Sequence, residues 1–132
     1  MIVSVPGKQP AVCNSLVELL DLYPTISNLC GLEVPTRLQG KDISKTLDDQ
    51  THQVREAAFS TAPNRKGFLL REDHWAYIQY QEDASGGIEL FDMHKDPQQY
   101  HNLAKSKEHE KIVEEFKNKF AAKMAEIRDN DL

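Results

Sequence analysis

The chain has 132 residues, of which 39% are hydrophobic and 28% are charged, and this composition suits a compact domain with a core. Its formal net charge of −5 argues against a nucleic-acid binder, which needs a basic face to neutralise phosphates. Its apolar runs fall short of the roughly 20 residues that span a membrane. Met1–Pro6 also lacks the pattern of a signal peptide, so we expect a soluble chain without a membrane partner.

The start of the chain predicts a strand. Residues Ile2–Val5 form a β-branched run that stops at Pro6 and Gly7. A strand needs a neighbour to pair with its backbone, and a domain that begins on one would leave an unprotected edge. We therefore expect that residues upstream have been removed, and that this strand, if unpaired, would promote dimerisation of the isolated chain.

Two short helices are predicted next. Ser15 can cap a helix with Glu18 at the capping-box position, and apolar residues at helical spacing continue to Tyr23. Pro24 biases the residue before it away from the helical region, so it is expected to end this helix and begin a second one. Gly31 is a suitable C-terminal stop for the second helix.

The middle of the chain changes from loops to strands. Residues 33–40 predict a loop, Asp42 could cap a short helix ending near Leu47, and residues 48–56 are polar and expected to be exposed. Connections between the strands that follow are short, so neighbouring strands must run antiparallel. The predicted strands are Ala57–Thr61, Phe68–Arg71, Trp75–Tyr80 and Ile88–Asp92, with a loop at Pro63–Gly67 between the first two.

A long helix is predicted from near Glu108 to about Asp129. Its apolar residues recur every three or four positions and so form one face: Ile112, Phe116, Phe120, Met124 and Ile127. We expect this stripe to pack on one face of the sheet. The predicted fold class is α+β, with an antiparallel sheet of about four strands and a long C-terminal helix, preceded by a strand and short helices.

Few residues suggest chemistry. The alternation of Asp92, His94 and Asp96 could place three metal ligands on one side of a strand, but an exposed polar strand end is the favoured interpretation. His74 precedes Trp75 in a predicted hairpin turn, so the two could contact a sugar, although a turn residue beside a core Trp is the more ordinary interpretation.

Three further residues have mainly structural interpretations. Arg71 lies in an otherwise apolar strand and is expected to form a structural ion pair rather than to bind sulfate. Cys13 and Cys30 have no metal or redox spacing and are expected to be free thiols. No motif of a nucleophilic triad, a phosphate-binding loop or a dinucleotide-binding fold is present in the sequence.

Several segments, taken together, resemble type I (formylglycine-dependent) sulfatases, most closely the bacterial enzymes of the iduronate-2-sulfatase type. They occur in that family's order: Leu19–Thr25, Leu29–Leu32, Leu38–Ile43, Leu70–Ile78, Glu89–Asp92, Asp96-Pro97 and Asn102–Ala104. The sequence departs from the family at Gln99, where Glu is usual, and at Ala76, where a basic residue is common. The resemblance runs from about Ile2 to Ala104.

The resemblance implies a longer, exported protein that hydrolyses the sulfate esters of sulfated glycans. Residues 1–32 would be the edge of an α/β catalytic domain, which is missing here, and residues 33–132 the C-terminal subdomain. The family's nucleophile is a formylglycine made in a C-x-P/A-x-R motif, beside a calcium ion. Neither Cys13 nor Cys30 starts such a motif, and the calcium-binding acidic pairs have no counterpart.

We therefore predict no catalytic residue and no metal ligand in this chain, which alone should be inactive. Its partners would be its own catalytic domain and, through it, the sulfated sugar, with His74 and the Pro63–Gly67 loop as candidate substrate contacts. The alternative is a free-standing binding module for sulfated glycans.

Overall fold

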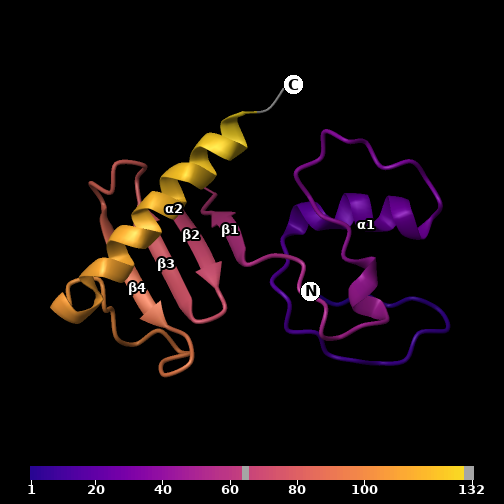
Figure 1. The fold of residues 1–132 in the computed structure, drawn as a ribbon, viewed down its shortest axis with the longest axis horizontal. Helices are drawn as coiled ribbons and strands as arrows, with labels where there is room; N and C mark the ends of the chain where they lie inside the picture. The colour runs from indigo at the N-terminus through magenta and orange to yellow at the C-terminus, as the bar shows by residue number, and fades with distance from the viewer. Residues whose placement is uncertain (64–65, 130–132) are drawn as a thin grey trace. The chain divides into compact units, whose positions relative to one another are not determined.

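The computed structural model describes residues 1–63 and 66–129, and it divides the chain into two compact units, Met1–Glu56 and Ala57–Leu132 (Figure 1). The predicted α+β class is confirmed, with four antiparallel strands in one sheet, a long C-terminal helix and short helices. The predicted division after residue 32 concerned membership of a larger catalytic domain and stays a prediction. Among the described residues, no helix is both long and apolar enough to cross a membrane.

Two predictions for the first unit are wrong. Ile2–Val5 is irregular chain rather than a strand, because residues 1–56 hold no strand beside it to accept its hydrogen bonds. The two helices are one continuous helical segment, in which the 3-10 helix η1 (Leu19–Asp21) runs directly into α1 (Leu22–Leu29). Pro24 does not break this segment because it lies in the first turn of α1, where its missing N–H has no helical partner to lose.

The start of the helical segment is fixed by Asp21 rather than by Ser15. The carboxylate of Asp21 accepts the backbone N–H of Glu18 at 2.7 Å, whereas the hydroxyl of Ser15 accepts the backbone N–H of Val54 at 2.7 Å. Ser15 therefore joins two distant stretches of the chain. The predicted short helix after Asp42 is present as η2 (Ser44–Leu47), and Asp42 accepts the backbone N–H of Ser44 at 2.9 Å.

Asp21 is also the hydrogen-bonding centre of the first unit. Its side chain is fully buried, it accepts the backbone N–H of Lys41 at 2.8 Å, and it forms an ion pair with Arg55. Arg55 forms a second ion pair with Glu18, and the Arg55 side chain is only 7% exposed. The prediction that residues 48–56 are all exposed is therefore wrong at Arg55, whose charge is buried against two carboxylates.

Two further contacts tie the same stretches together. The hydroxyl of Thr25 donates to the carbonyl of Asp21 at 2.5 Å and accepts the backbone N–H of Ile43 at 3.0 Å. Gly40 packs so closely that a Cβ there would lie 2.0 Å from the carbonyl oxygen of Leu20, which only glycine avoids. The sequence Asp21-Leu-Tyr-Pro-Thr and the sequence around Gly40 are thus two halves of one contact.

The second unit is an antiparallel meander in the order β1-β2-β3-β4. The strands are β1 (Ala57–Thr61), β2 (Gly67–Glu72), β3 (Trp75–Tyr80) and β4 (Gly87–Asp92), which confirms all four predicted strands. Phe59, Leu70, Tyr77 and Leu90 are paired in turn across the strands and so share one face. Alternation places the neighbouring residues of each strand on the other face.

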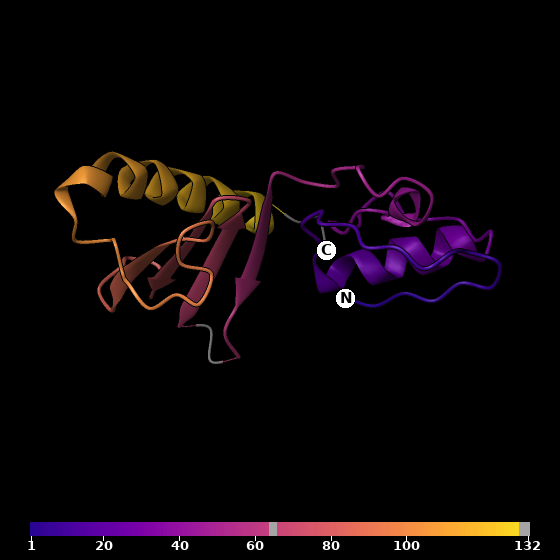
Figure 2. The same cartoon turned by 90° about the horizontal axis from the view of Figure 1, so that it is seen from below.

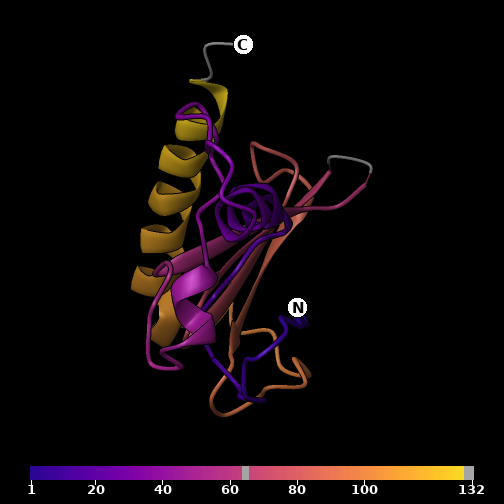
Figure 3. The ribbon, with the colours of Figure 1, turned by 90° about the vertical axis from the view of Figure 1, so that its right-hand side faces the viewer.

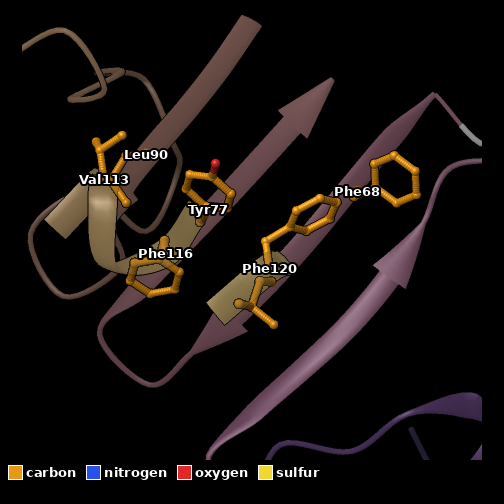
Figure 4. Close-up of a cluster of buried hydrophobic side chains, with 7 residues drawn as sticks. Phe68, Tyr77, Leu90, Val113, Phe116 and Phe120 are labelled. Atoms are coloured by element: carbon orange, nitrogen blue, oxygen red, sulfur yellow. The ribbon is translucent and has the colours of Figure 1, made fainter. Parts of the chain in front are cut away.

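The long helix α2 (Glu110–Arg128) lies along this face of the sheet, as Figures 2 and 3 show, and the short 3-10 helix η3 (Lys107–His109) precedes it. Figure 4 shows side chains of its apolar stripe beside those of the sheet, with Phe116 next to Tyr77 and Phe120 next to Phe68. The rings of Tyr77 and Phe116 stack with centroids 5.5 Å apart. At about 25 cal/mol per Å², burial of the two Phe side chains contributes several kcal/mol to this packing.

The Asn102 side chain covers the outer edge of β4 by forming hydrogen bonds that a neighbouring strand would otherwise form. The Asn102 amide oxygen accepts the backbone N–H of Leu90 at 3.1 Å, and its amide nitrogen donates to the carbonyl of Ile88 at 3.2 Å. The backbone N–H of Leu103 then donates to the carbonyl of Leu90 at 2.8 Å. The Asn102–Ala104 segment therefore satisfies edge groups that would otherwise be open for pairing.

Candidate functional site

The candidate site is a cluster of aromatic rings at one end of the sheet, which we call the histidine cluster: His74, His94, His109 and Trp75, with Asp73 and Asp92. The His74 ring is stacked between Trp75, at 4.6 Å between centroids, and His94, at 4.5 Å. The His109 ring meets the edge of Trp75 at 5.7 Å. The cluster therefore combines the β2–β3 turn, the turn after β4 and the start of α2.

Two carboxylates contact the histidines. Nε2 of His74 lies 3.0 Å from Oδ1 of Asp92, whose side chain is only 5% exposed, and Nε2 of His94 lies 3.2 Å from Oδ2 of Asp73. The His74 and His94 side chains are 44% and 55% exposed, so each keeps a surface toward solvent. Because both faces of the His74 ring are stacked and its Nε2 atom is buried, the part of His74 that is open to a sugar is the remaining ring edge.

The turn that carries His94 is built on Asp92. Oδ1 of Asp92 accepts the backbone N–H groups of His94 at 3.1 Å and Lys95 at 3.0 Å, which is an Asx turn. The backbone N–H of Met93 donates to the carbonyl of His74 at 2.7 Å and joins the two turns. Burial of Asp92 opposes its ionisation, but the His74 ring and the two backbone N–H groups outweigh it and lower the pKa of Asp92 to about 2.

We expect this low pKa to make the second unit lose stability between about pH 4 and pH 2. The pKa of Asp92 in the folded protein is below the ordinary value of 3.8. Ionised Asp92 therefore stabilises the folded state above about pH 4. This stabilisation is lost as the pH falls through the folded-state pKa. Urea unfolding followed by Trp75 fluorescence should show Asp92→Asn less stable than wild type at pH 7 and equal to it near pH 2. A difference that does not change with pH would contradict the prediction.

Arg71 braces the turn that carries His74. Its Nη1 donates to the carbonyl oxygens of Asp73 at 2.9 Å and of Trp75 at 3.4 Å. The prediction of a structural role rather than a sulfate ligand agrees with these contacts, but its partners are carbonyl oxygens in place of the expected carboxylate. A guanidinium has several N–H donors and can bind more than one carbonyl oxygen, so Arg71 does not require a carboxylate partner.

The two predicted substrate contacts lie at opposite ends of the sheet. The Pro63–Gly67 loop joins β1 to β2 and includes residues 64 and 65, which lie outside the described residues, while His74 follows the far end of β2. The six residues of β2 separate the two turns by roughly 17 Å. The structure therefore does not bring the loop and His74 together into one pocket.

The geometry supports neither a metal site at Asp92, His94 and Asp96 nor a nucleophile made from Cys13 or Cys30. Asp92, His94 and Asp96 are engaged separately, since Asp96 accepts the backbone N–H of His101 at 2.7 Å. Within residues 1–63 and 66–129, no three His, Cys, Asp or Glu side chains are placed to hold a metal ion, whereas calcium needs about six to eight oxygen ligands. Cys13 and Cys30 are free thiols, and neither stands in the C-x-P/A-x-R motif from which formylglycine is made.

Comparison with known proteins identifies the family. The model of the N-sulphoglucosamine sulphohydrolase C-terminal family matches residues 1–126. The chain belongs to this sulfatase C-terminal family. The resemblance found in the sequence is thereby confirmed.

Three of the similar proteins are named as sulfatases, and the chain corresponds to a small part of each. It is 32% identical over 108 residues to the Delta 4,5-hexuronate-2-O-sulfatase of Bacteroides thetaiotaomicron, covering 74% of this chain and 21% of that protein. It is 30% identical over 103 residues to human Arylsulfatase K, covering 69% of this chain and 19% of the relative. The solved structure of a 2-O GAG sulfatase superposes with a TM-score of 0.69 at 28% identity, covering 83% of this chain and 25% of that one.

Sequence reasoning missed most of this sulfatase domain's buried polar contacts. His74 was singled out, but its stacking on His94 and its contact with Asp92 require the turn after β4 to fold back onto the β2–β3 turn. The alternation of Asp92 and His94 in the sequence pointed to the right place. The structure shows that these two residues form a turn rather than a metal site. The burial of Arg55 had no local signal, because its partners lie more than 30 residues earlier.

Proposed function

We propose that this chain is the non-catalytic C-terminal domain of a longer sulfatase that hydrolyses sulfate esters of sulfated glycans. The observation that carries the proposal is the family match over residues 1–126, together with the chain spanning only about a fifth of its curated relatives. The nucleophile and the calcium ion would be supplied by the rest of that protein. Its export, expected from the resemblance, remains part of the proposal.

The names of similar proteins support a substrate class. One relative acts on 2-O-sulfated Delta 4,5-hexuronate by its name, and one similar structure is named a 2-O GAG sulfatase. Another, 25% identical with a TM-score of 0.69, is described in complex with its substrate D-glucosamine-2-N,6-O-disulfate. We infer a sulfated sugar of glycosaminoglycan type as substrate, with a 2-O-sulfated hexuronate as the first to test.

We further propose that His74 contacts the sugar from the edge of the catalytic cleft. Its ring is held between Trp75 and His94, so binding would cost little further ordering of the side chain. Its side chain is 44% exposed and can still reach a ligand. The free-standing binding module is the second candidate, and the same cluster would serve it, but we have no observation that favours it.

The test uses the longer protein, loaded with calcium, and a 2-O-sulfated Delta 4,5-hexuronate disaccharide, with sulfate release as the readout. We expect release by wild type, and we expect His74→Ala to raise KM about tenfold with kcat within about twofold, as for one lost hydrogen bond. His101→Ala is the matched control, since His101 is exposed and lies outside the histidine cluster.

The outcomes separate the two parts of the proposal. If wild type releases no sulfate from this or other sulfated glycans, the proposed function is wrong. If it does and His74→Ala matches wild type in KM, the sugar contact is wrong while the function stands. A fall in melting temperature without a change in KM would assign His74 a purely structural role.

A further inference from the structure

Asp92 holds one edge of the ring at the centre of the histidine cluster. Nε2 of His74 lies 3.0 Å from Oδ1 of Asp92, and this nitrogen is shielded from solvent. The two atoms are close enough for an ion pair, but the N–H is not aligned for a hydrogen bond, so the attraction is mainly electrostatic. Trp75 covers one face of the ring and His94 the other, so only the opposite edge is left open.

The Asp92 carboxylate is fixed in place before any ligand arrives. Its side chain is only 5% exposed, and Oδ1 accepts the backbone N–H groups of His94 at 3.1 Å and Lys95 at 3.0 Å. Because its pKa is lowered to about 2, Asp92 stays negatively charged throughout the pH range in which histidines titrate. An ionised carboxylate therefore always faces Nε2 of His74.

A carboxylate at this distance controls which ring nitrogen of His74 carries the proton. A neutral imidazole has one N–H donor and one bare acceptor nitrogen. A bare Nε2 would place its lone pair against those of Oδ1 in a buried site, whereas a protonated Nε2 is attracted to the carboxylate. The proton of neutral His74 is therefore held on Nε2, which leaves Nδ1 as the acceptor.

Nδ1 of His74 lies on the edge that a ligand can reach. Among the described residues, Nε2 of His74 is a buried nitrogen without a hydrogen-bond partner, and Nδ1 is not. Nδ1 has no hydrogen bond within that part of the chain either, so it is solvent that satisfies it. The 44% exposure of the side chain agrees with this arrangement.

We propose that Asp92 is a positioning residue for substrate binding, which keeps the proton of His74 on Nε2 so that Nδ1 accepts a hydrogen bond from a sugar hydroxyl group. This inference rests on the proposed function, in which His74 contacts the sugar. It makes His74 selective for a hydroxyl group over a sulfate or a carboxylate, because a bare nitrogen and an anionic oxygen have no proton to share. Protonation of Nδ1 removes the acceptor, so this contact should weaken as the pH falls through the range in which histidines titrate.

Other charged groups near the ring influence the pH at which it gains its second proton. They come from β2 and its turn, from the turn after β4 and from η3: Arg71, Asp73, Asp92, His94, Lys95 and His109. Asp73 contacts His94 rather than His74, at 3.2 Å. Asp73→Ala is therefore a matched control for the proton on His74, since it removes a neighbouring carboxylate without touching Nε2.

Proton–nitrogen NMR spectra of the histidine rings of the 132-residue chain locate the proton directly, at about pH 7.5, where an ordinary histidine is neutral. We expect His74 in the Nε2–H form in wild type and in Asp73→Ala. Asp92→Ala should give averaged signals for the two nitrogens, because the ring can then turn over between its stacking neighbours. Wild-type His74 with its proton on Nδ1, or an unchanged spectrum in Asp92→Ala, would overturn the proposal.

Kinetics of the longer protein test the contact itself, with calcium and the 2-O-sulfated Delta 4,5-hexuronate disaccharide. Asp92→Ala should raise KM about threefold at about pH 7.5 with kcat within about twofold. Asp92→Asn should recover most of this loss, since its amide oxygen can still face Nε2 and the two backbone N–H groups. The ratio of KM between His74→Ala and wild type should fall from about tenfold at pH 7.5 to within about twofold near pH 5.

The outcomes separate this proposal from the proposed function. A KM ratio that grows on acidification would mean that protonated His74 donates to an anion, which contradicts the acceptor role. A fall in melting temperature for Asp92→Ala without a change in KM would make Asp92 purely structural. A wild-type longer protein that releases no sulfate contradicts the proposed function instead, and the NMR spectra still decide the position of the proton.

Discussion

Replacing Asp21 with Ala is expected to lower the free energy of unfolding of residues 1–56 by about 3–5 kcal/mol, the usual cost of removing one partner of a buried ion pair. The substitution leaves the Arg55 guanidinium buried with one of its two carboxylate partners, Glu18. It also removes the acceptor for the backbone N–H groups of Glu18 and Lys41. Hydrogen exchange at the Ile43 amide, which donates to Thr25 rather than to Asp21, measures the effect, because the only Trp lies in the other unit.

Asp48→Ala is the matched control for this prediction. Asp48 also forms an ion pair, with Lys8, but its side chain is 70% exposed. Exposed pairs of this kind contribute less than about 1 kcal/mol. If Asp21→Ala changed the exchange of the Ile43 amide no more than Asp48→Ala does, Asp21 would not be the centre of the first unit.

Phe116→Ala is expected to destabilise the second unit by about 3–5 kcal/mol, the range for truncating a buried Phe. Phe116 is 1% exposed and stacks on Tyr77, so the substitution would leave a cavity between α2 and the middle of the sheet. Urea unfolding followed by Trp75 fluorescence measures it, since Trp75 packs against the same core.

A graded substitution and an exposed one test the reason for this loss. Phe116→Leu should cost clearly less than Phe116→Ala, because more of the cavity stays filled. Lys117→Ala, at the next position of the helix, should change the free energy of unfolding by less than about 0.5 kcal/mol, since its side chain is 43% exposed. Equal losses for all three variants would mean that helix propensity, rather than burial, controls the stability of this unit.

The hydroxyl of Tyr77 is a polar group inside this core, and burial changes its pKa and requires a hydrogen-bond partner. Burial, with a smaller contribution from Glu114, raises the pKa of Tyr77 to about 12. Its hydroxyl donates to Gln79 at 2.7 Å, and the Gln79 amide donates to the carbonyls of Gln81 and Glu82. The buried hydroxyl is therefore satisfied through a chain of side-chain and backbone bonds that ends in the β3–β4 turn.

The second unit could be predicted from the sequence because its signals are local. Short runs separated by turns and loops defined all four strands, and short connections required antiparallel pairing. The spacing of Ile112, Phe116 and Phe120 defined the face of α2. Each of these patterns is read within a window of a few residues. The hydrogen bonds of Asn102 to the edge of β4 could not be predicted in this way, because they join residues that are 12 positions apart in the sequence.

The first unit was predicted less well because its structure depends on contacts distant in sequence. Helical spacing correctly indicated helix on both sides of Pro24, but periodicity cannot say whether an apolar face meets a core or an absent partner. Pro24 was expected to end a helix, yet a proline in the first turn is harmless. The strand at Ile2–Val5 was predicted from propensity alone, and a strand forms only where another strand pairs with it.

The candidate site could be predicted only in part. His74 was identified from its place beside Trp75 in a turn, and the structure adds His94 and Asp92 to it. The separation of the two predicted contacts by the length of β2 could have been inferred from the meander, because successive hairpin turns lie at opposite ends of a sheet. The role of His74 in binding sugar stays a prediction.

The most direct test of the account is a sulfatase assay of the 132-residue chain itself, with calcium and a chromogenic sulfate ester, beside the longer protein. We predict hydrolysis by the longer protein and, for the chain, a rate equal to that of buffer, because nothing in its sequence supplies the aldehyde-derived nucleophile. Turnover by the chain above that background, lost when Cys13 or Cys30 is replaced by Ala, would contradict the assignment of catalysis to the rest of the protein.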